Sequence, residues 1–358
     1  MGIGKDATGG GNNAIGIGTS ANAQSAGGIA IGQTASVPFA AGNAVSIGIA
    51  SDALGTDAVA LGNEAQATVA SAVAIGGFSV ASGDASVAIG QRTDATGANS
   101  VAIGGASSDA DSADASGSGS TAIGANTLAS GLESLALGKN AEATASEAIA
   151  IGAFADATAV NTLALGYIAQ ATASQAISIG ANSDATAINS IGMGNVALAS
   201  GVDSVAIGHN ATATDVGEFA YASGQFAAAG DAQISVYVLR NQTTDATQTE
   251  LFADGSSADI SVASDSTMFF RASIVARRTD ADNESAAYVI EGCIDNNAGT
   301  TALVGGLGTK TIVAEDTSAW DVTITADNTN DGINVLVTGE ASKTIRWVAR
   351  IEITVVAG

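Results

Sequence analysis

Large apolar residues alternate with small ones in a short phrase that recurs along the first 208 residues of the chain. The stretch "SVAIGQRTDATGANSVAIGG", residues 86–105, contains "SVAIG" twice, and the second copy starts 14 residues after the first. Val87 and Ile89 flank the small Ala88, and a glycine follows. Because side chains of a strand point alternately to its two faces, this alternation predicts a short strand with both aliphatic side chains on one face.

The glycine that closes each phrase recurs with a period of 14 residues, which is typical of a stacked solenoid. The spacing is 16 between Gly32 and Gly48, and 20 between Gly104 and Gly124, where an acidic insertion stands. After most of these glycines a run of the form small-x-Ala predicts a second strand. Each coil is therefore expected to contain two strands and two tight turns, with glycine allowing close approach at the corners.

The alternation also predicts how a coil is filled. We expect the two aliphatic residues of each phrase to fill its interior and the alanines to form thin walls. Alanine walls would leave a long apolar face on a single chain, and such faces mark interfaces. Several chains are therefore expected to meet at their alanine faces around a symmetry axis.

The phrase "NSVAIG", with its 14-residue period and the following A-x-A run, resembles the head repeat of trimeric autotransporter adhesins, the YadA-like heads. The resemblance covers residues 1 to about 216 and includes fifteen recurrences. It implies a left-handed parallel β-roll with three chains side by side, and hence a homotrimer. Phage fibres use the same module as a shaft, so the resemblance does not imply a bacterial adhesin.

The period fails after Gly208, and residues 217–230 are expected to form a neck. From residue 231 the pattern becomes that of longer strands separated by turn sequences such as "TDADNE" and "DNTNDG". The expected strands are 233–241, 267–279, 285–295, 309–315, 320–327, 333–339 and 343–356. The chain is thus expected to be all-β, with a β-roll shaft at 1–216 and an antiparallel β-sandwich or jelly roll at 231–358.

The second domain resembles the C-terminal domains of tail fibres of tailed phages, particularly phages of aquatic bacteria. The stretches that carry the resemblance are "GDAQISVYVLRNQTTDATQTELFADG", "VARRTDADNESAAYVIEGCIDNNAGTTALVG" and "GEASKTIRWVARIEITV". It implies a tail-fibre protein of the virion, outside the cell, whose tip binds a glycan or protein of the host surface and whose other partners are tail or baseplate proteins. A bacterial adhesin head fragment is the alternative, because the chain begins in mid-pattern at Ile3-Gly4; the lack of a heptad run after the repeats favours the fibre.

The net charge of the chain limits the classes of molecule that it can bind. The 358 residues include 35 Asp and Glu against 11 Lys and Arg, a formal net charge of −24, which disfavours nucleic acid and anionic membranes. No apolar run approaches the roughly 20 residues of a membrane-spanning helix. The single cysteine, Cys293, excludes an intrachain disulfide and is expected to pack in a strand.

Residue types for catalysis are sparse. His209 is the only histidine and follows a corner glycine, so one chain offers no Ser-His-Asp, Cys-His or zinc site. Polysaccharide hydrolysis needs two carboxylates about 5–9 Å apart, and the cluster of Asp280, Asp282 and Glu284 stands in a turn. We expect a solvated hairpin tip there, and hence no enzyme, no metal and no cofactor; a polysaccharide depolymerase that uses this cluster is the second alternative.

Receptor-binding residues are expected in the turns of the second domain and at one tryptophan. Trp347 shares a strand face with Ile345 and Ile351 and is expected in the core, whereas Trp320, at a strand start, is expected to be the more exposed. The candidate residues are Asp280, Asp282, Asn283, Glu284, Trp320, Asn328, Asn330 and Asp331.

Overall fold

The computed structural model describes residues 1–105, 108, 112–281 and 283–358, which form strands and no helix. The chain divides into two compact units, Met1–Gln175 and Ala176–Gly358. The first unit is a parallel β-solenoid, and the second contains further coils of the same kind and two antiparallel sheets. The predicted fold class is confirmed: the chain is all-β, with about 16 solenoid turns followed by antiparallel sheets. The described part of the chain has no helix long and apolar enough to cross a membrane.

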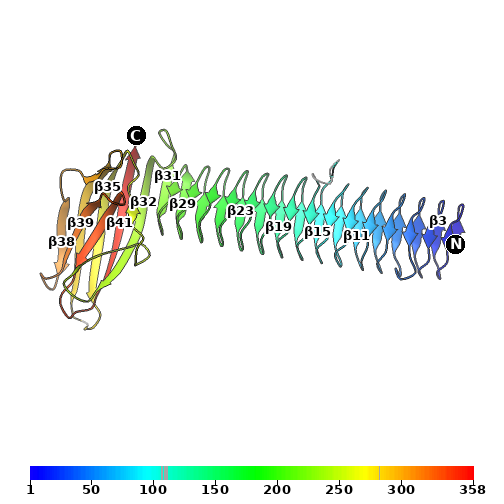
Figure 1. The fold of residues 1–358 in the computed structure, drawn as a ribbon, viewed down its shortest axis with the longest axis horizontal. Helices are drawn as coiled ribbons and strands as arrows, with labels where there is room; N and C mark the ends of the chain where they lie inside the picture. Colours follow the sequence, from blue (N-terminus) through cyan, green and yellow to red (C-terminus); the bar gives the residue numbers. More distant parts are fainter. Residues whose placement is uncertain (106–107, 109–111, 282) are drawn as a thin grey trace. The chain divides into compact units, whose positions relative to one another are not determined.

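Two parallel ladders run through the first unit, and Figure 1 shows their short arrows following one another. Neighbouring strands of a ladder come from successive coils, so Val87 lies beside Val101. The first ladder consists of β1 (Gly2–Ile3), β3 (Ile15–Ile17), β5 (Ile29–Ile31), β7 (Val45–Ile47), β9 (Val59–Leu61), β11 (Val73–Ile75), β13 (Val87–Ile89), β15 (Val101–Ile103), β17 (Thr121–Ile123), β19 (Leu135–Leu137), β21 (Ile149–Ile151) and β23 (Leu163–Leu165). The second consists of β2 (Thr8–Gly9), β4 (Asn22–Ala23), β6 (Ser36–Val37), β8 (Asp52–Ala53), β10 (Gln66–Ala67), β12 (Val80–Ala81), β14 (Asp94–Ala95), β16 (Asp114–Ala115), β18 (Leu128–Ala129), β20 (Glu142–Ala143), β22 (Asp156–Ala157) and β24 (Gln170–Ala171).

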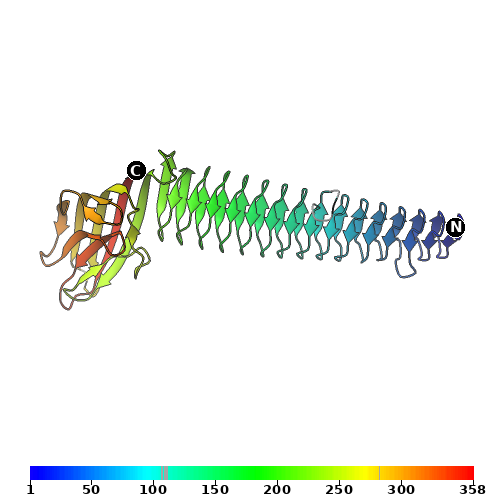
Figure 2. The same cartoon turned by 45° about the horizontal axis from the view of Figure 1, so that its top comes forward.

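The first ladder keeps its register where the repeat carries extra residues. Val101 pairs with Thr121 and Ile103 with Ile123, although 20 residues rather than 14 separate the partners. The arrows of β15 and β17 therefore follow one another as elsewhere in the unit (Figure 2). The six additional residues between these two strands leave their register unchanged.

Small side chains fill each coil, and large ones point outward. Ala88 and Ala95 are fully buried, whereas Ile89 is 36% exposed and Leu61 42% exposed. In nearly every coil the middle residue of the three-residue strand is buried and its neighbours are not. The predicted filling of the coil is therefore wrong: the space between the two ladders accepts almost only Ala, Ser and Thr, so the larger aliphatic side chains point away from it.

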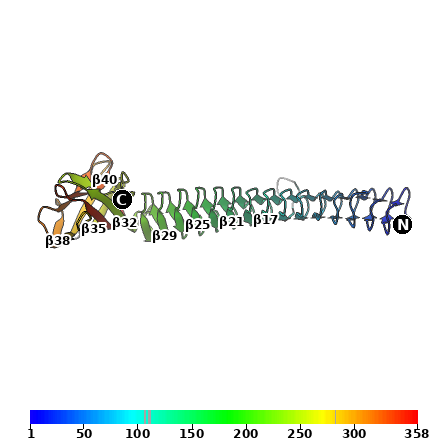
Figure 3. The same ribbon diagram turned by 90° about the horizontal axis from the view of Figure 1, so that it is seen from below.

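The outward side chains line up along each unit, because a parallel ladder in register stacks like positions about 4.8 Å apart. We call the first and third residues of the three-residue strands the aliphatic row. Leu61, Ile89, Leu137 and Leu165 of the first unit each have more than a third of their surface exposed. The succession of coils that carries the row is seen from below in Figure 3. A single chain thus leaves a long aliphatic surface uncovered.

Glycine closes each coil because the backbones of neighbouring coils touch there. Gly90 has φ +132°, and a Cβ on it would clash with the backbone carbonyl of Gly104 in the next coil. A side chain at this corner would meet both an unfavourable backbone conformation and a steric block. The period of the repeat is therefore a packing requirement.

In the second unit the last parallel strand of the coils pairs with the first antiparallel strand of the sandwich. The parallel strands are β25 (Ile177–Ile179), β27 (Ile191–Met193), β29 (Val205–His209) and β31 (Phe219–Ser223) in one ladder, and β26 (Asp184–Ala185), β28 (Leu198–Ala199) and β30 (Thr212–Ala213) in the other. β31 pairs in parallel with β29 and, on its other edge, antiparallel with β32 (Ala232–Thr243). One sheet therefore contains both the last coils and the strands that follow them.

Two antiparallel sheets pack face to face at the end of this unit. The larger has the order β32, β41 (Ile345–Ala357), β35 (Ser266–Arg278) and β36 (Ser285–Asn296), with β37 (Thr301–Leu303) and β38 (Thr309–Glu315) on the free edge of β36. In the smaller, β40 (Gly332–Thr338) pairs with β39 (Asp321–Asp327) on one edge and with β33 (Gln248–Glu250) and β34 (Ile260–Ser261) on the other. Side chains of both sheets form one apolar core. The expectation that Trp347 lies in this core is confirmed, since it is fully buried.

Candidate functional site

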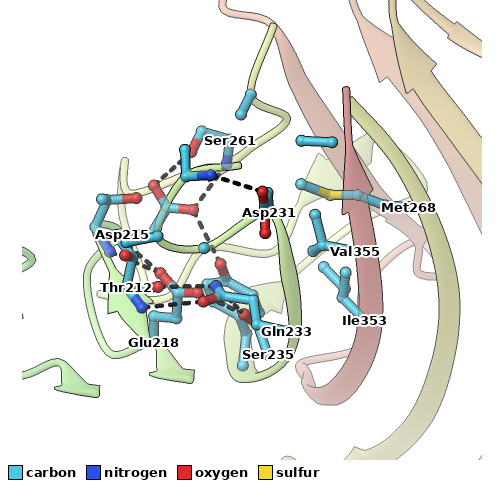
Figure 4. A pocket seen from close by; sticks show the side chains of 17 residues that line it. Thr212, Asp215, Glu218, Asp231, Gln233, Ser235, Ser261, Met268, Ile353 and Val355 are labelled. Carbon is cyan, nitrogen blue, oxygen red and sulfur yellow. Dashed lines mark hydrogen bonds between the residues drawn. The ribbon is translucent and has the colours of Figure 1, made fainter. Parts of the chain in front are cut away.

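A cavity of about 210 Å³ lies in the second unit, between the final coil and the large sheet. Residues of β30, of the turn at 214–218 and of β32, β34, β35 and β41 line it (Figure 4). One wall is polar, with Asp215, Glu218 and Gln233, and the other carries Met268 and Val355. The cavity is the best candidate in the described chain for a small polar ligand with an apolar face.

Glu218 holds the turn that forms the polar wall. It is only 3% exposed, and its Oε2 accepts hydrogen bonds from the backbone N–H groups of Thr214 (2.8 Å) and Asp215 (3.2 Å). Its Oε1 accepts a hydrogen bond of 2.6 Å from the Ser235 hydroxyl of β32. A carboxylate satisfied in this way fixes the last coil to the first long strand.

Asp215 connects the same turn to both sheets. Its Oδ2 accepts hydrogen bonds from the Tyr237 hydroxyl (3.1 Å) and the Ser261 backbone N–H (2.9 Å), and its Oδ1 accepts one from the Ser261 hydroxyl (2.7 Å). Tyr237 belongs to β32 of the large sheet and Ser261 to β34 of the small one. The turn is thus bonded to both layers of the sandwich.

Burial changes the acidity of these groups. It raises the pKa of the Glu218 carboxyl, the nearby charge of Asp215 adds to the rise, and the hydrogen bond from Ser235 opposes it. Burial also raises the pKa of the Tyr237 hydroxyl, together with the two carboxylates. A carboxyl of raised pKa beside a second carboxylate is what a general acid requires, but every oxygen of this pair already accepts a hydrogen bond from the protein. Their contacts in this structure are those of a structural joint.

Gln233 and Thr212 complete the polar wall. Gln233 accepts a hydrogen bond from the Thr212 backbone N–H (3.0 Å) and donates one to the Thr212 carbonyl (2.8 Å). The Thr212 hydroxyl is buried and has no hydrogen-bond partner among the described residues. A hydroxyl in this state is available to a ligand oxygen or to water.

In the first predicted cluster, at residues 280–284, Asp280 and Glu284 form ion pairs with basic side chains of the protein. The Asp280 carboxylate accepts hydrogen bonds from the Arg278 guanidinium (2.9 and 3.0 Å) and from the backbone N–H of Thr344 (2.9 Å). The Arg278 hydrogen bond holds the pKa of Asp280 well below its usual range. Glu284 is paired with Arg278 (3.4 Å) and with Lys343 (2.8 Å). Asn283 is exposed, and Asp282 lies outside the described residues.

The second predicted cluster is held by β37 and by its own turn. Asn328 accepts a hydrogen bond from the Thr301 backbone N–H (2.8 Å), and Asp331 accepts one from the Thr301 hydroxyl (3.0 Å). Asn330 donates to the Asp327 carboxylate (2.8 Å). These contacts shape the turn between β39 and β40 and leave its rim exposed at Asn328 and Asn330.

The structure does not bring the two clusters together. The turn at 279–284 precedes β36, whereas Thr301, which binds the second cluster, lies opposite Asn296 at the far end of that strand. A strand of 12 residues is roughly 37 Å long at about 3.4 Å per residue. The predicted residues therefore offer two separate surfaces rather than one site.

The expectation that Trp320 is exposed is wrong. Its side chain is 2% exposed and packs on Trp347 with ring centroids 5.8 Å apart. It lies directly before β39, whose inner face covers the core of the sandwich. A ring in this position cannot stack on a sugar without unfolding of the small sheet.

Sequence reasoning missed the residues around the cavity. Glu218 stands at the position where the earlier coils have a small residue such as Ala176, Ser190 or Ser204. A carboxylate in a column of buried small residues is an available signal that the last coil differs from the others. The hydrogen bond that Ser261 donates to Asp215 joins residues 46 apart in the chain, and no pattern in the sequence indicates it.

Repeats of the YadA head domain match residues 41–65, 53–79, 67–93, 81–107, 115–141, 129–155, 157–183, 185–211 and 199–218. The chain thus carries adhesin-like YadA head repeats over much of its solenoid. No curated protein sequence matches the chain. The resemblance of the C-terminal domain to fibre tips stays a prediction.

Two solved structures are similar at a low level. Tailspike protein gp49 of the Acinetobacter baumannii bacteriophage Fri1, a capsular polysaccharide depolymerase, is 12% identical, with a TM-score of 0.22 over 83% of this chain and 46% of that one. The tailspike protein of Acinetobacter phage vB_ApiP_P1 is 10% identical, with a TM-score of 0.17 over 84% of this chain and 51% of that one. The chain spans about half the length of each.

The prediction that this chain is not an enzyme is corrected by the first of these structures, because that tailspike is a depolymerase. The expected absence of an activity is therefore withdrawn. With TM-scores this low, the likeness carries no argument about a reaction or a catalytic residue in this chain.

Proposed function

We propose that this protein is a homotrimeric attachment protein of the phage tail-fibre kind, exposed on the virion, which binds a glycan of the bacterial surface. Residues 1–216 serve as a spacer that holds three chains side by side, and residues 231–358 form the receptor-binding part. Three copies raise a weak contact with a repetitive polysaccharide through effective concentration. Other tail proteins would anchor the fibre.

The aliphatic row carries this proposal. Side chains such as Leu61, Ile89 and Leu165 point out of the coil with more than a third of their surface exposed. A regular apolar line of this kind marks an interface in a stable protein. Parallel copies in register would cover the row along its whole length, which agrees with the match to YadA head repeats.

The cavity beside Glu218 supports a sugar ligand. The Thr212 hydroxyl, which has no partner among the described residues, offers a polar group on one side, and Met268, Ile353 and Val355 offer an apolar surface on the other (Figure 4). A sugar ring presents hydroxyl groups at its rim and C–H groups on its faces. A cavity of about 210 Å³ lies below the range for drug-sized ligands and fits a single ring or the end of a glycan.

A bacterial surface adhesin is the second candidate. The match to YadA head repeats favours it, since this module is named for an adhesin head. The tail fibre and the adhesin would both be trimers that bind a surface glycan. They differ in the anchor, which is the phage tail for the fibre and the bacterial membrane for the adhesin. Sequencing of the flanking genes separates them: baseplate genes support the fibre, and a membrane-anchor sequence in frame supports the adhesin.

Two measurements on the full chain test the proposal. Light scattering after size exclusion should give three times the chain mass of 34.4 kDa, and a folded monomer would refute the assembly. Binding to a panel of purified bacterial surface polysaccharides should be lost in Ala263→Trp, which adds a large ring at an exposed residue of the cavity lining. It should be kept in Ser264→Trp, because Ser264 does not line the cavity. Equal loss in both variants, or no binding to any polysaccharide, would refute the cavity as the glycan site. Release of reducing ends in the same samples measures hydrolysis directly.

A further inference from the structure

The aliphatic row does not end with the coils. Phe219 and Tyr221 of β31 lie beside Val205 and Ile207 of β29 and continue the row; they are 41% and 47% exposed. In the antiparallel pairing of β31 with β32, Phe219 lies opposite Val236 and Tyr221 opposite Ile234. Residues opposite one another share a face of the sheet. The outward surface of the last coils therefore continues onto the large sheet of the sandwich.

The outer face of the large sheet is apolar where an antiparallel sheet facing water is normally polar. Val238 of β32, Val348 of β41, and Phe269 and Val275 of β35 are each about half exposed, between 47% and 57%. Val348 lies directly opposite Val275, so these two side chains adjoin across the strands. Scattered exposed apolar residues are ordinary, but a group across neighbouring strands marks an interaction surface.

The same face also carries arginines, two of which are paired with carboxylates: Arg271 with Glu291 (3.3 Å) and Arg350 with Glu352 (3.1 Å). Arg271 and Arg277 of β35 and Arg346 and Arg350 of β41 are all exposed and occupy its outward positions. Arg346 lies directly opposite Arg277 in the pairing of these two strands. Arginine beside aliphatic and aromatic side chains is the composition that protein–protein interfaces favour.

We infer that the outer face of β32, β41, β35 and β36 docks against a second copy of this chain. The inference rests on the proposed trimer and extends its interface from the coils to the sandwich. Two observations favour a second copy over a glycan: the face is continuous with the aliphatic row, and it combines arginines with exposed aliphatic and aromatic side chains. The cavity beside Glu218 then remains for the receptor.

Cys293 reports on this face directly. It is the only cysteine, and it lies opposite the outward-pointing Phe269 in the pairing of β35 with β36. Reaction of its thiol with a bulky maleimide measures whether the face is covered. We expect slow labelling in the full-length wild type, and labelling about tenfold faster or more in the double variant Val275→Glu/Val348→Glu. Both replaced side chains are half exposed in the single chain, so the variant should fold.

Leu307→Glu is the matched control, because Leu307 is 69% exposed and lies in a loop outside the sheet. It should label as slowly as the wild type. A trimer by mass whose wild-type Cys293 reacts as fast as in the double variant would overturn the inference and leave the proposed trimer intact. A monomer by mass would refute the proposed function first. If Cys293 is labelled slowly only after a polysaccharide that binds the protein is added, the face binds the glycan, and the inference is also overturned.

Discussion

Trp320 and Trp347 pack together between the two sheets, with ring centroids 5.8 Å apart and planes inclined at 58°. The two rings differ in one respect. Trp347 donates an indole N–H hydrogen bond to the Thr243 hydroxyl (3.0 Å), whereas the Trp320 N–H is buried without a partner among the described residues. The buried indole N–H therefore stabilises the fold at Trp347, where it has an acceptor, and destabilises it at Trp320, where the described part of the chain offers none.

The tryptophan pair gives a first prediction, which concerns stability. Trp347→Phe removes the donor to the buried Thr243 hydroxyl and should cost about 1–3 kcal/mol beyond the lost packing. Trp320→Phe removes an unpaired donor and should cost less, although Trp320→Ala should cost about 3–5 kcal/mol through the cavity it leaves. Urea unfolding of the three variants measures the order. A larger loss for Trp320→Phe than for Trp347→Phe would show that the N–H of Trp320 is satisfied.

The second prediction concerns the corners of the coils. Gly90→Ala should destabilise the protein by at least about 1–3 kcal/mol, because a Cβ at φ +132° would clash with the Gly104 carbonyl. Gly77→Ala is the control, since the nearest atom to its Cβ would be a carbonyl oxygen at 3.7 Å. Thermal unfolding of both variants is the measurement. Equal midpoints would contradict the steric argument.

The third prediction concerns assembly. Leu61→Lys places a charge in the aliphatic row and should reduce the proposed trimer to smaller species, because the lysine would have to be buried between chains. In a protein that works as a single chain the change should be harmless, since Leu61 is already 42% exposed. Asn63→Lys, two residues on at an exposed corner, should leave the mass unchanged. Light scattering at several concentrations compares the two variants, and an unchanged mass for Leu61→Lys would remove the row from the interface.

The fourth prediction concerns pH. Burial, together with the charges of Asp259 and Asp327, raises the pKa of Glu250 from 4.5 to about 7. The folded chain therefore keeps a proton that the unfolded chain releases between these values, and this group's contribution to stability is complete below pH 4.5 and lost as pH rises to 7. Glu250→Gln should match the wild type near pH 4.5 and unfold at a higher temperature at pH 8. A difference that stays constant between pH 4.5 and 8 would exclude the shift.

The alternation around Val87, Ala88 and Ile89 predicts the strands and the period of the coils correctly. It does not tell which face of the strand is inside, because both faces are apolar and hydrophobicity alone favours the larger side chains for the interior. The decisive quantity is the separation of the two ladders. That separation is set by the turns and the glycine corners, and it leaves room for Ala88 and not for Ile89.

The site depends on contacts between distant residues, and this limits what the sequence predicts. Turn composition marks 279–284 and 327–331 as loops, yet it cannot tell that β36 separates them or that Arg278 and Thr301 occupy their polar groups. Trp320 begins a strand, and only the packing of the small sheet on the large one buries it. Glu218 is the exception, because its departure from a column of small residues is visible before the fold is known.

The unbroken pairing of Val101 with Thr121 across six additional residues has an evolutionary consequence. Each coil contacts its neighbours through the same positions, so unequal recombination between repeated codons can add or delete whole 14-residue units and still yield a folded chain. The number of coils is then free to drift or to be selected for length, independently of the sandwich that follows them. Additional residues between strands that keep their register, as β15 and β17 do, can likewise be acquired at little cost to folding.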